Sequence, residues 1–408
     1  MNKTNETAAS IRDPRRRTAK AVAFALAIAS FAFAHPDATA GNPEKAKRMF
    51  DRLTGTPPSP TKLTELTAML DSGTSLQDTA MFIMDKGEEH SRTFYSVTLK
   101  NFATPWTNRD QTVFAPLNDY TATVIGVVRD DKDFRGILSE DILYVGNAQP
   151  AYSTTSNAHY ETLESENADL RLVLVEQQQS SLNGLPAAAT AGVITSRAAA
   201  EAFFIDGTNR AMFRFTLLNH LCRDMEQVHD TSRPPDRIRQ DVTRSPGGDS
   251  SVFLNNCVGC HDGMDPLAQA FAYYDFDETQ GRLVYTPGVV QPKYLINSDN
   301  FKPGYVTPDD SWENRWRLPG QNTLLGWQGQ DGQVRRGAGA KSLGQELANS
   351  DAFAQCQAEK VFRTVCFRSP SDAADQNRVK DVILPAFRSN GYRLKTVFAE
   401  TAAYCAGQ

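Results

Sequence analysis

Apolar side chains recur every three to four residues along most of the chain, a spacing that predicts α-helices. The first helix is expected from Pro43 to Leu53, before Gly55 and a Pro-rich turn. Similar patterns predict helices at 118–128, 134–143, 196–204 and 208–221, and a run rich in Leu and Val predicts a short strand at 170–175. We therefore expect a mainly α, multi-helix globular protein.

The last third of the chain shows two different patterns. Residues 291–340 are rich in Pro, Gly and Trp without a clear period, which predicts a long irregular insertion. Three helices are expected beyond it, at 351–367, 372–388 (kinked at Pro385) and 392–404, forming a C-terminal helical bundle. These changes predict an N-terminal helical domain at 41–165, a central domain at 166–290, the insertion, and a C-terminal three-helix module at 341–408.

The first 40 residues have the features of a signal peptide. A basic segment with Arg15, Arg16 and Arg17 precedes Ala21 to Ala34, fourteen uncharged apolar or small residues, and two A-x-A cleavage sequences follow. This apolar segment is shorter than the about 20 residues that span a bilayer. We expect export by the general secretory route to the periplasm or the exterior, with no stable membrane insertion after cleavage. An uncleaved anchor is the alternative.

The net charge of the chain limits the kinds of binding partner to be expected. Residues 1–40 hold six of the 43 Lys and Arg and three of the 48 Asp and Glu, so residues 41–408 carry 37 basic and 45 acidic side chains, a net charge of −8. This acidic balance argues against nucleic acid as a partner. It is compatible with a basic redox partner protein, although a solvated acidic surface is the commoner explanation.

The most specific chemical signal is NNCVGCHDGMDP, in which Cys257, Cys260 and His261 form a C-x-x-C-H motif. With six Cys and six His in 408 residues, chance gives this spacing in roughly one sequence in a thousand, whereas c-type haem attachment requires it. A zinc site is the other interpretation. Export favours haem, because structural zinc sites use reduced cysteines, which are typical of the cytosol.

One covalent haem c would be joined to Cys257 and Cys260 by thioether bonds, with His261 as the proximal iron ligand. A distal ligand is harder to find, because no His follows His261 and no Met follows Met264, which is too near His261 in the chain and is assigned to packing. The upstream candidates are Met212, His220, Met225 and His229. A vacant or water-bound iron position is the alternative.

Two groups of aromatic residues are candidates for contact with haem. Asp265 and Pro266 look like the N-cap and first residue of a helix whose Phe271 and Tyr274 could pack on the porphyrin; ordinary core positions are the alternative. The second group, candidates for a haem lid or ligand surface unless they belong to a packed irregular insertion, comprises Trp312, Trp316 and Trp327.

Three functions fit such a site. Six-coordinate iron would serve electron transfer in a periplasmic oxidative system, and an open distal position would serve a haem oxidoreductase acting on peroxide or an organic substrate. The third is a non-redox binding module in which haem is structural. A single motif argues against a di-haem peroxidase. Electron transfer is the preferred function, although the chain is longer than a simple carrier needs.

Several separated segments resemble one family, the planctomycete-type cytochrome c-like proteins made of serial domains of unknown function with a single C-x-x-C-H haem motif. The similar segments are AKRMFDRLTG, DDKDFRGILSEDILYVGN, AGVITSR, RAMFRFTLLNHLC, CVGCHDGMDPLAQAF and FAQCQAEKVFRTVCFR. The chain departs from that family at RDMEQVHDTS, after Cys222, and in the Trp-rich insertion. The resemblance implies haem binding and export, and it implies no substrate.

The four cysteines outside the motif can form disulfides, since export permits them. Cys356 and Cys366 are ten residues apart on one expected helix, which separates them by about 15 Å, beyond the roughly 7 Å limit between Cα atoms. If the three terminal helices run up, down and up, Cys366 and Cys405 finish at the same end. We therefore expect Cys366–Cys405 and, by elimination, Cys222–Cys356; four free thiols are the alternative.

Overall fold

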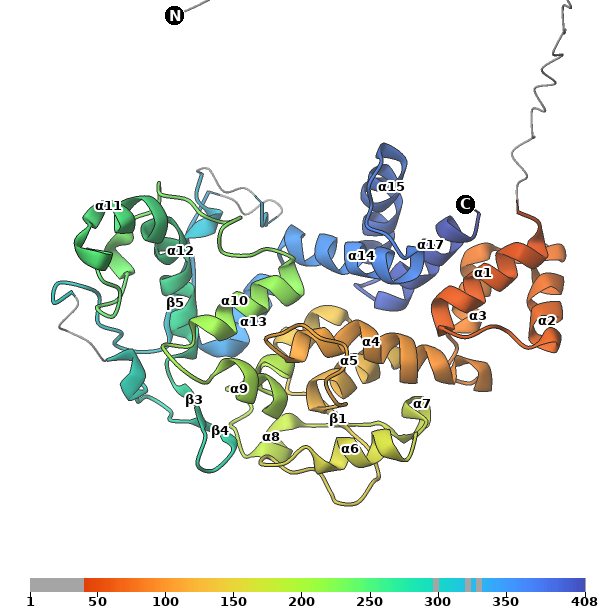
Figure 1. Ribbon diagram of the computed structural model, residues 1–408, viewed down its shortest axis with the longest axis horizontal. Coiled ribbons are helices and arrows are strands. Elements are labelled where there is room, and N and C mark those ends of the chain that lie inside the picture. Colours follow the sequence, from red (N-terminus) through yellow and green to blue (C-terminus); the bar gives the residue numbers. More distant parts are fainter. Residues whose placement is uncertain (1–39, 296–300, 320–323, 328–331, 408) are drawn as a thin grey trace, which may run out of the picture. The chain divides into compact units, whose positions relative to one another are not determined.

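The computed structural model describes residues 40–295, 301–319, 324–327 and 332–407, so the expected signal peptide, apart from Ala40, lies outside the described residues. The N-terminal part is helical, as predicted (Figure 1). Gly55, with φ 71°, ends the first helix, and the Ser59 hydroxyl caps the second by accepting from the Lys62 N–H. The helices are α1 (Asn42–Thr54), α2 (Pro60–Asp71), α3 (Leu76–Ile83), α4 (Leu99–Ala103) and α5 (Asp119–Arg129).

The segment predicted as a strand at 170–175 is mostly helical. Asp169 caps a short helix here by accepting from the Arg171 N–H, and the chain becomes extended at Leu174, one residue before the strand begins at Val175. The helix predicted at 134–143 is also too long, because a 3-10 helix (Phe134–Leu138) gives way to a strand at 143–145 that pairs antiparallel with residues 175–177. The elements are β1 (Leu143–Val145), α6 (Ala158–Ser165), α7 (Leu170–Val173), β2 (Val175–Gln177), α8 (Gln179–Asn183), α9 (Arg197–Phe203) and α10 (Arg210–Thr216).

The C-x-x-C-H segment lies in a continuous helical stretch. The stretch starts at α11 (Ser250–Val252), passes through a π-helical turn (Phe253–Cys257) and continues as α12 (Val258–Ala268). The prediction of a helix start at Asp265 and Pro266 is therefore wrong, because both residues lie inside α12. The helix predicted beyond them is soon replaced by a hairpin of β3 (Tyr274–Asp277) and β4 (Arg282–Tyr285).

The described part of the insertion has regular structure where none was predicted. Its strands β5 (Ser311–Asn314) and β6 (Arg335–Ala338) pair antiparallel, and β5 lies beside α12 (Figure 1). All three tryptophans of this region are buried, with exposed fractions of 2% for Trp312, 4% for Trp316 and 2% for Trp327. They therefore belong to the main apolar core, in which Trp316 contacts Phe213 of α10.

The C-terminal module is helical, as predicted. A π-helical turn (Val379–Ile383) ends two residues before Pro385, where a kink is expected, because proline cannot continue the ordinary helical hydrogen-bond pattern. Disulfides join Cys366 to Cys405 and Cys222 to Cys356, the two expected pairs, with Cα atoms 5.7 and 5.2 Å apart. The helices are α13 (Gly339–Ala348), α14 (Asp351–Cys366), α15 (Ala373–Arg378), α16 (Leu384–Ser389) and α17 (Leu394–Ala406).

One large apolar core connects the described parts of the chain. It includes side chains from Ala46 in α1 to Ala406 in α17, and α17 packs against α1, α3 and α14 (Figure 1). The segments separated at residues 165, 290 and 340 thus share this core, and the domain boundaries placed there stay predictions. Among the described residues, no helix is long and apolar enough to cross a membrane.

Candidate functional site

The three residues of the C-x-x-C-H motif lie on one side of the helical stretch. Cys257, at the end of the π-helical turn, stands three residues before Cys260 and four before His261, spacings that place it on the same side of the helix as each of them, while Cys260 and His261 are about 100° apart. Cys257 and Cys260 are half-buried and are the two cysteines that form no disulfide. The thiols and the imidazole are therefore available together on one face.

The imidazole of His261 is oriented by a buried carboxylate. Its Nδ1 lies 3.1 Å from Oδ1 of Asp265, one turn further along α12. The side chain of His261 is 20% exposed, whereas that of Asp265 is fully buried. An ionised carboxylate only accepts hydrogen bonds, so Nδ1 donates and Nε2 of the neutral ring keeps a free electron pair. Nε2 is therefore the nitrogen that can bind a metal ion.

Arginines hold that carboxylate in its charged form. Arg210 donates from Nε to Oδ1 at 2.8 Å and from Nη2 to Oδ2 at 2.9 Å of Asp265, and Arg239 Nη2 lies 3.8 Å from Oδ1. Burial alone would raise the pKa of Asp265, but Arg210, Arg239 and His261 together lower it well below its usual range. Asp265 is therefore an anion at neutral pH despite complete burial.

The opposite face of α12 is closely packed. A Cβ atom built on Gly259 would lie 2.5 Å from the ring of His229, and one on Gly263 would lie 2.3 Å from Nε1 of Trp316. Helical periodicity places both glycines about 160° away from His261. The two glycines therefore let aromatic rings approach the helix from behind, and they place His229 behind the motif.

Two of the expected distal candidates are built into the core. Met212 is 2% exposed, and its sulfur lies 3.8 Å from the Thr216 hydroxyl. His220 is 1% exposed and shares a 2.6 Å hydrogen bond with the Tyr120 hydroxyl through Nε2. Burial, with a smaller effect of Lys360, lowers the pKa of His220 well below its usual value. Both side chains are therefore buried in the core and contact other core residues.

The other two candidates lie beside the motif. The carbonyl of Met225 accepts a 3.5 Å contact from the Cys260 thiol, and the backbone N–H of Asp230 donates to the Gly259 carbonyl at 2.9 Å. The segment that contains Met225 and His229 thus runs along the start of α12. Met225 thus contacts the motif through its backbone, although its side chain is also buried at 8% exposure, and His229 packs against the back of α12.

The Cys260 thiol is not activated as a nucleophile. Burial raises its pKa to about 11, and nearby carboxylates, first among them that of Asp262, add to this effect. Reactive thiolates have lowered pKa values. Cys260 therefore lacks the lowered pKa that a nucleophilic thiolate needs.

The aromatic candidates Phe271 and Tyr274 lie in the core. Phe271 is fully buried, Tyr274 is 1% exposed, and both rings contact Phe204 at centroid distances of 5.5 and 5.6 Å. The Tyr274 hydroxyl donates to the Ala189 carbonyl at 2.6 Å. These contacts are those of ordinary core residues.

The described residues contain no group of three or more Cys, His, Asp or Glu side chains arranged to hold a metal ion. A zinc site would need about four such ligands converging on one point. Covalent haem has a different requirement, since the two thiols bind the vinyl groups and only the imidazole binds iron. The motif supplies the two thiols and the one imidazole that covalent haem would use.

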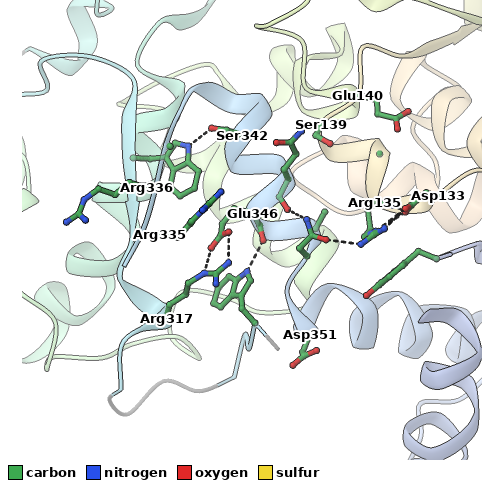
Figure 2. Close-up of a pocket in the computed structure, with 18 residues that line it drawn as sticks. Asp133, Arg135, Ser139, Glu140, Arg317, Arg335, Arg336, Ser342, Glu346 and Asp351 are labelled. Carbon is green, nitrogen blue, oxygen red and sulfur yellow. Dashed lines mark hydrogen bonds and ion pairs between the residues drawn. The ribbon is translucent and has the colours of Figure 1, made fainter. Parts of the chain in front are cut away.

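A polar cavity of about 800 Å³ lies elsewhere, between α13, the β5–β6 hairpin and the 133–140 segment (Figure 2). Its wall includes the buried pair of Arg317 with Glu346, whose two hydrogen bonds measure 2.6 and 2.8 Å, and Trp312, which donates to Ser342. Its charged groups balance: Arg135, Arg317, Arg335 and Arg336 against Asp133, Glu140, Glu346 and Asp351. The chain on either side of 324–327 lies outside the described residues, so this cavity supports no assignment.

Comparisons with protein-family models, with curated proteins and with solved structures find no match for this chain. Its function must therefore be argued from its own residues.

Sequence reasoning missed the role of Asp265 and Arg210. The Asp-Pro pair is typical of a helix start, so the helix was predicted to begin at Asp265. The four-residue spacing from His261 to Asp265 was therefore not considered as a contact within one helix. That spacing brings side chains together only if the helix already includes the motif. A helix assigned from Val258 onward would have revealed the pair.

Proposed function

We propose that this protein is an exported mono-haem c-type cytochrome that transfers electrons in a periplasmic oxidative system. The observation that carries the proposal is the state of its cysteines: four form disulfides, while Cys257 and Cys260 stay free beside an imidazole whose Nε2 is available. The disulfides agree with an oxidising compartment. The resemblance to cytochrome c-like proteins with one haem motif points the same way.

The residues have separate tasks in this proposal. Cys257 and Cys260 would hold the haem, and His261 would bind the iron, which supplies one-electron oxidation and reduction. Asp265 keeps the imidazole in one tautomer, and α12 is fixed from behind by Trp316. A redox partner protein is the expected partner.

A second candidate function is a haem oxidoreductase with an open iron position, acting on peroxide or an organic substrate. One observation favours it: Met212 and His220 are held by core contacts, and His229 packs behind α12. Met225 is then the remaining candidate, and its backbone carbonyl contacts the Cys260 thiol. An iron without a distal side-chain ligand would be open to small molecules.

Haem attachment is tested by expression with a periplasmic cytochrome maturation system. The wild-type protein should stain for haem after denaturation, and the double variant Cys257→Ser, Cys260→Ser should lose the stain. The variant Cys366→Ser, Cys405→Ser is the matched control, because it removes two cysteines outside the motif and should retain the stain. A wild-type protein that carries zinc and no covalent haem would refute the proposal.

Carbon monoxide separates the two candidate functions. If a side chain occupies the distal position, the ferrous protein should resist carbon monoxide, and substitution of one residue among Met212, His220, Met225 and His229 should allow binding. Optical spectra of the ferric and ferrous forms, with and without the gas, measure this. Rapid binding by the wild-type protein would favour the oxidoreductase.

A further inference from the structure

The carboxylate of Asp265 is held by hydrogen bonds from its own helix, α12, and from other parts of the chain. Its carboxylate lies one helical turn from His261 and receives the Nδ1–H of that ring at 3.1 Å. The same carboxylate accepts two hydrogen bonds from the side chain of Arg210, from a different helix, and a longer one, at 3.4 Å, from the backbone N–H of Arg239. A fully buried anion with this many donors is fixed in position.

Arg210 is itself anchored on both sides. It donates to the carboxylate of Asp241 at 2.6 and 3.0 Å, in addition to its two bonds to Asp265. The guanidinium therefore bridges two carboxylates, and its planar shape fixes the plane of each. Asp241 has no hydrogen bond to His261 among those in the described residues, so the two carboxylates differ in one respect that matters: only Asp265 contacts the imidazole.

We propose that Asp265, clamped by Arg210, is the positioning residue that sets the tautomer, orientation and donor strength of His261 as an iron ligand, and so favours the ferric state. This inference rests on the proposed attachment of haem. A negative acceptor on Nδ1–H increases the electron density at Nε2, and a stronger donor stabilises the more highly charged ferric iron. A low reduction potential follows from this arrangement.

The test compares two Asp→Asn variants of the holoprotein. Asp265→Asn keeps an oxygen that accepts the Nδ1–H but removes its charge, and Asp241→Asn removes the same charge from the other side of Arg210. Redox titration of Asp265→Asn should show the ferric-to-ferrous equilibrium shifted towards ferrous iron by at least about tenfold, or about 59 mV for one electron. Asp241→Asn should show a much smaller shift. The frequency of the iron–histidine stretching vibration in the ferrous protein should fall only in Asp265→Asn.

The outcomes separate the inference from the function on which it rests. Equal potentials in wild type and Asp265→Asn, with haem attached in both, would overturn the role of Asp265 and leave the cytochrome proposal intact. Equal shifts in both variants would show a general charge effect and would also overturn it. A wild-type protein without covalent haem would remove both proposals.

If Asp265→Asn does not fold, a measurement on the wild-type protein tests the role of Asp265 instead. In its reduced form or its carbon monoxide adduct, nuclear magnetic resonance of ¹⁵N-histidine-labelled protein should show the Nδ1 proton of His261 exchanging slowly with water. A proton that exchanges as fast as that of an exposed imidazole would contradict the clamp.

Discussion

Two histidines of this protein illustrate how a partner determines the chemistry of the same side chain. His220 shares its hydrogen bond with a neutral phenol, that of Tyr120, among core aromatic rings, and it is 1% exposed. His261 donates to the anionic Asp265, and its side chain is 20% exposed. The first environment disfavours a charged ring, whereas the second fixes Nδ1 as a hydrogen-bond donor and leaves Nε2 without a protein partner among the described residues.

The surroundings of the two histidines differ in the same way. The region of His220 is tied to the C-terminal module by the Cys222–Cys356 disulfide and by a hydrogen bond from Gln357 to the His220 carbonyl. The region of His261 has free thiols and a network of ion pairs. We infer that the first region contributes stability and the second contributes function, and four predictions test this division.

The largest effect on stability is expected from the disulfide in the His220 region. Cys222 and Cys356 are 134 residues apart, so the double variant Cys222→Ala, Cys356→Ala should lose about 5 kcal/mol of unfolding free energy in the chain-entropy model. The control pair, Cys366 and Cys405, spans 39 residues and should cost about 4 kcal/mol. Urea unfolding under oxidising conditions measures both. An unchanged unfolding free energy would contradict a structural role for the first bridge.

Exchanging the two histidines for alanine should give opposite results. His220→Ala leaves a cavity in the core and should cost about 2–4 kcal/mol of unfolding free energy while leaving the haem spectrum unchanged. His261→Ala should leave covalent haem attached but change the ferrous and ferric spectra, because the iron loses its proximal ligand, at a smaller cost in stability. Urea unfolding and optical spectra of both variants provide the measurement. A haem spectrum altered by His220→Ala would instead identify His220 as a ligand.

The sequence predicted these two regions unequally, for physical reasons. α14 and α17 have regular apolar spacing, so the positions of Cys356, Cys366 and Cys405 on them were predictable, and with them the pairing. α12 contains Gly, Cys, His and Pro in place of a regular apolar stripe, so the residue at which this helix begins could not be predicted from the sequence. The contact between His261 and Asp265 depends on that start. The clamp by Arg210 is a tertiary contact across 55 residues, and local patterns do not encode it.

A smaller loss of stability is expected from methyl groups added behind the motif. Gly263→Ala places its Cβ 2.3 Å from Nε1 of the buried Trp316, and overpacking of this kind costs about 1–3 kcal/mol. Gly259→Ala is the matched control: its Cβ meets His229, which is half-buried and so less enclosed than Trp316, and its cost should therefore be lower. Urea unfolding of both variants ranks them. A greater loss in Gly259→Ala would show that His229 is the more rigid support.

The smallest effect is the contribution of His220 to the pH dependence of stability. Burial, with a contribution from Lys360, lowers the pKa of the folded ring well below the value of about 6.5 in the unfolded chain. Above pH 6.5 neither state binds the proton; below it the unfolded chain does and the folded protein does not. Stability is therefore complete above pH 6.5 and should fall by up to about 1.4 kcal/mol per pH unit as the pH decreases, until the folded ring also takes up a proton. The unfolding free energy of His220→Gln, measured from pH 7 to pH 5, should lack this component, so that its difference from wild type shrinks with decreasing pH. Parallel curves for the two proteins would show that His220 is protonated equally in both states and would remove the distinction between the two histidines.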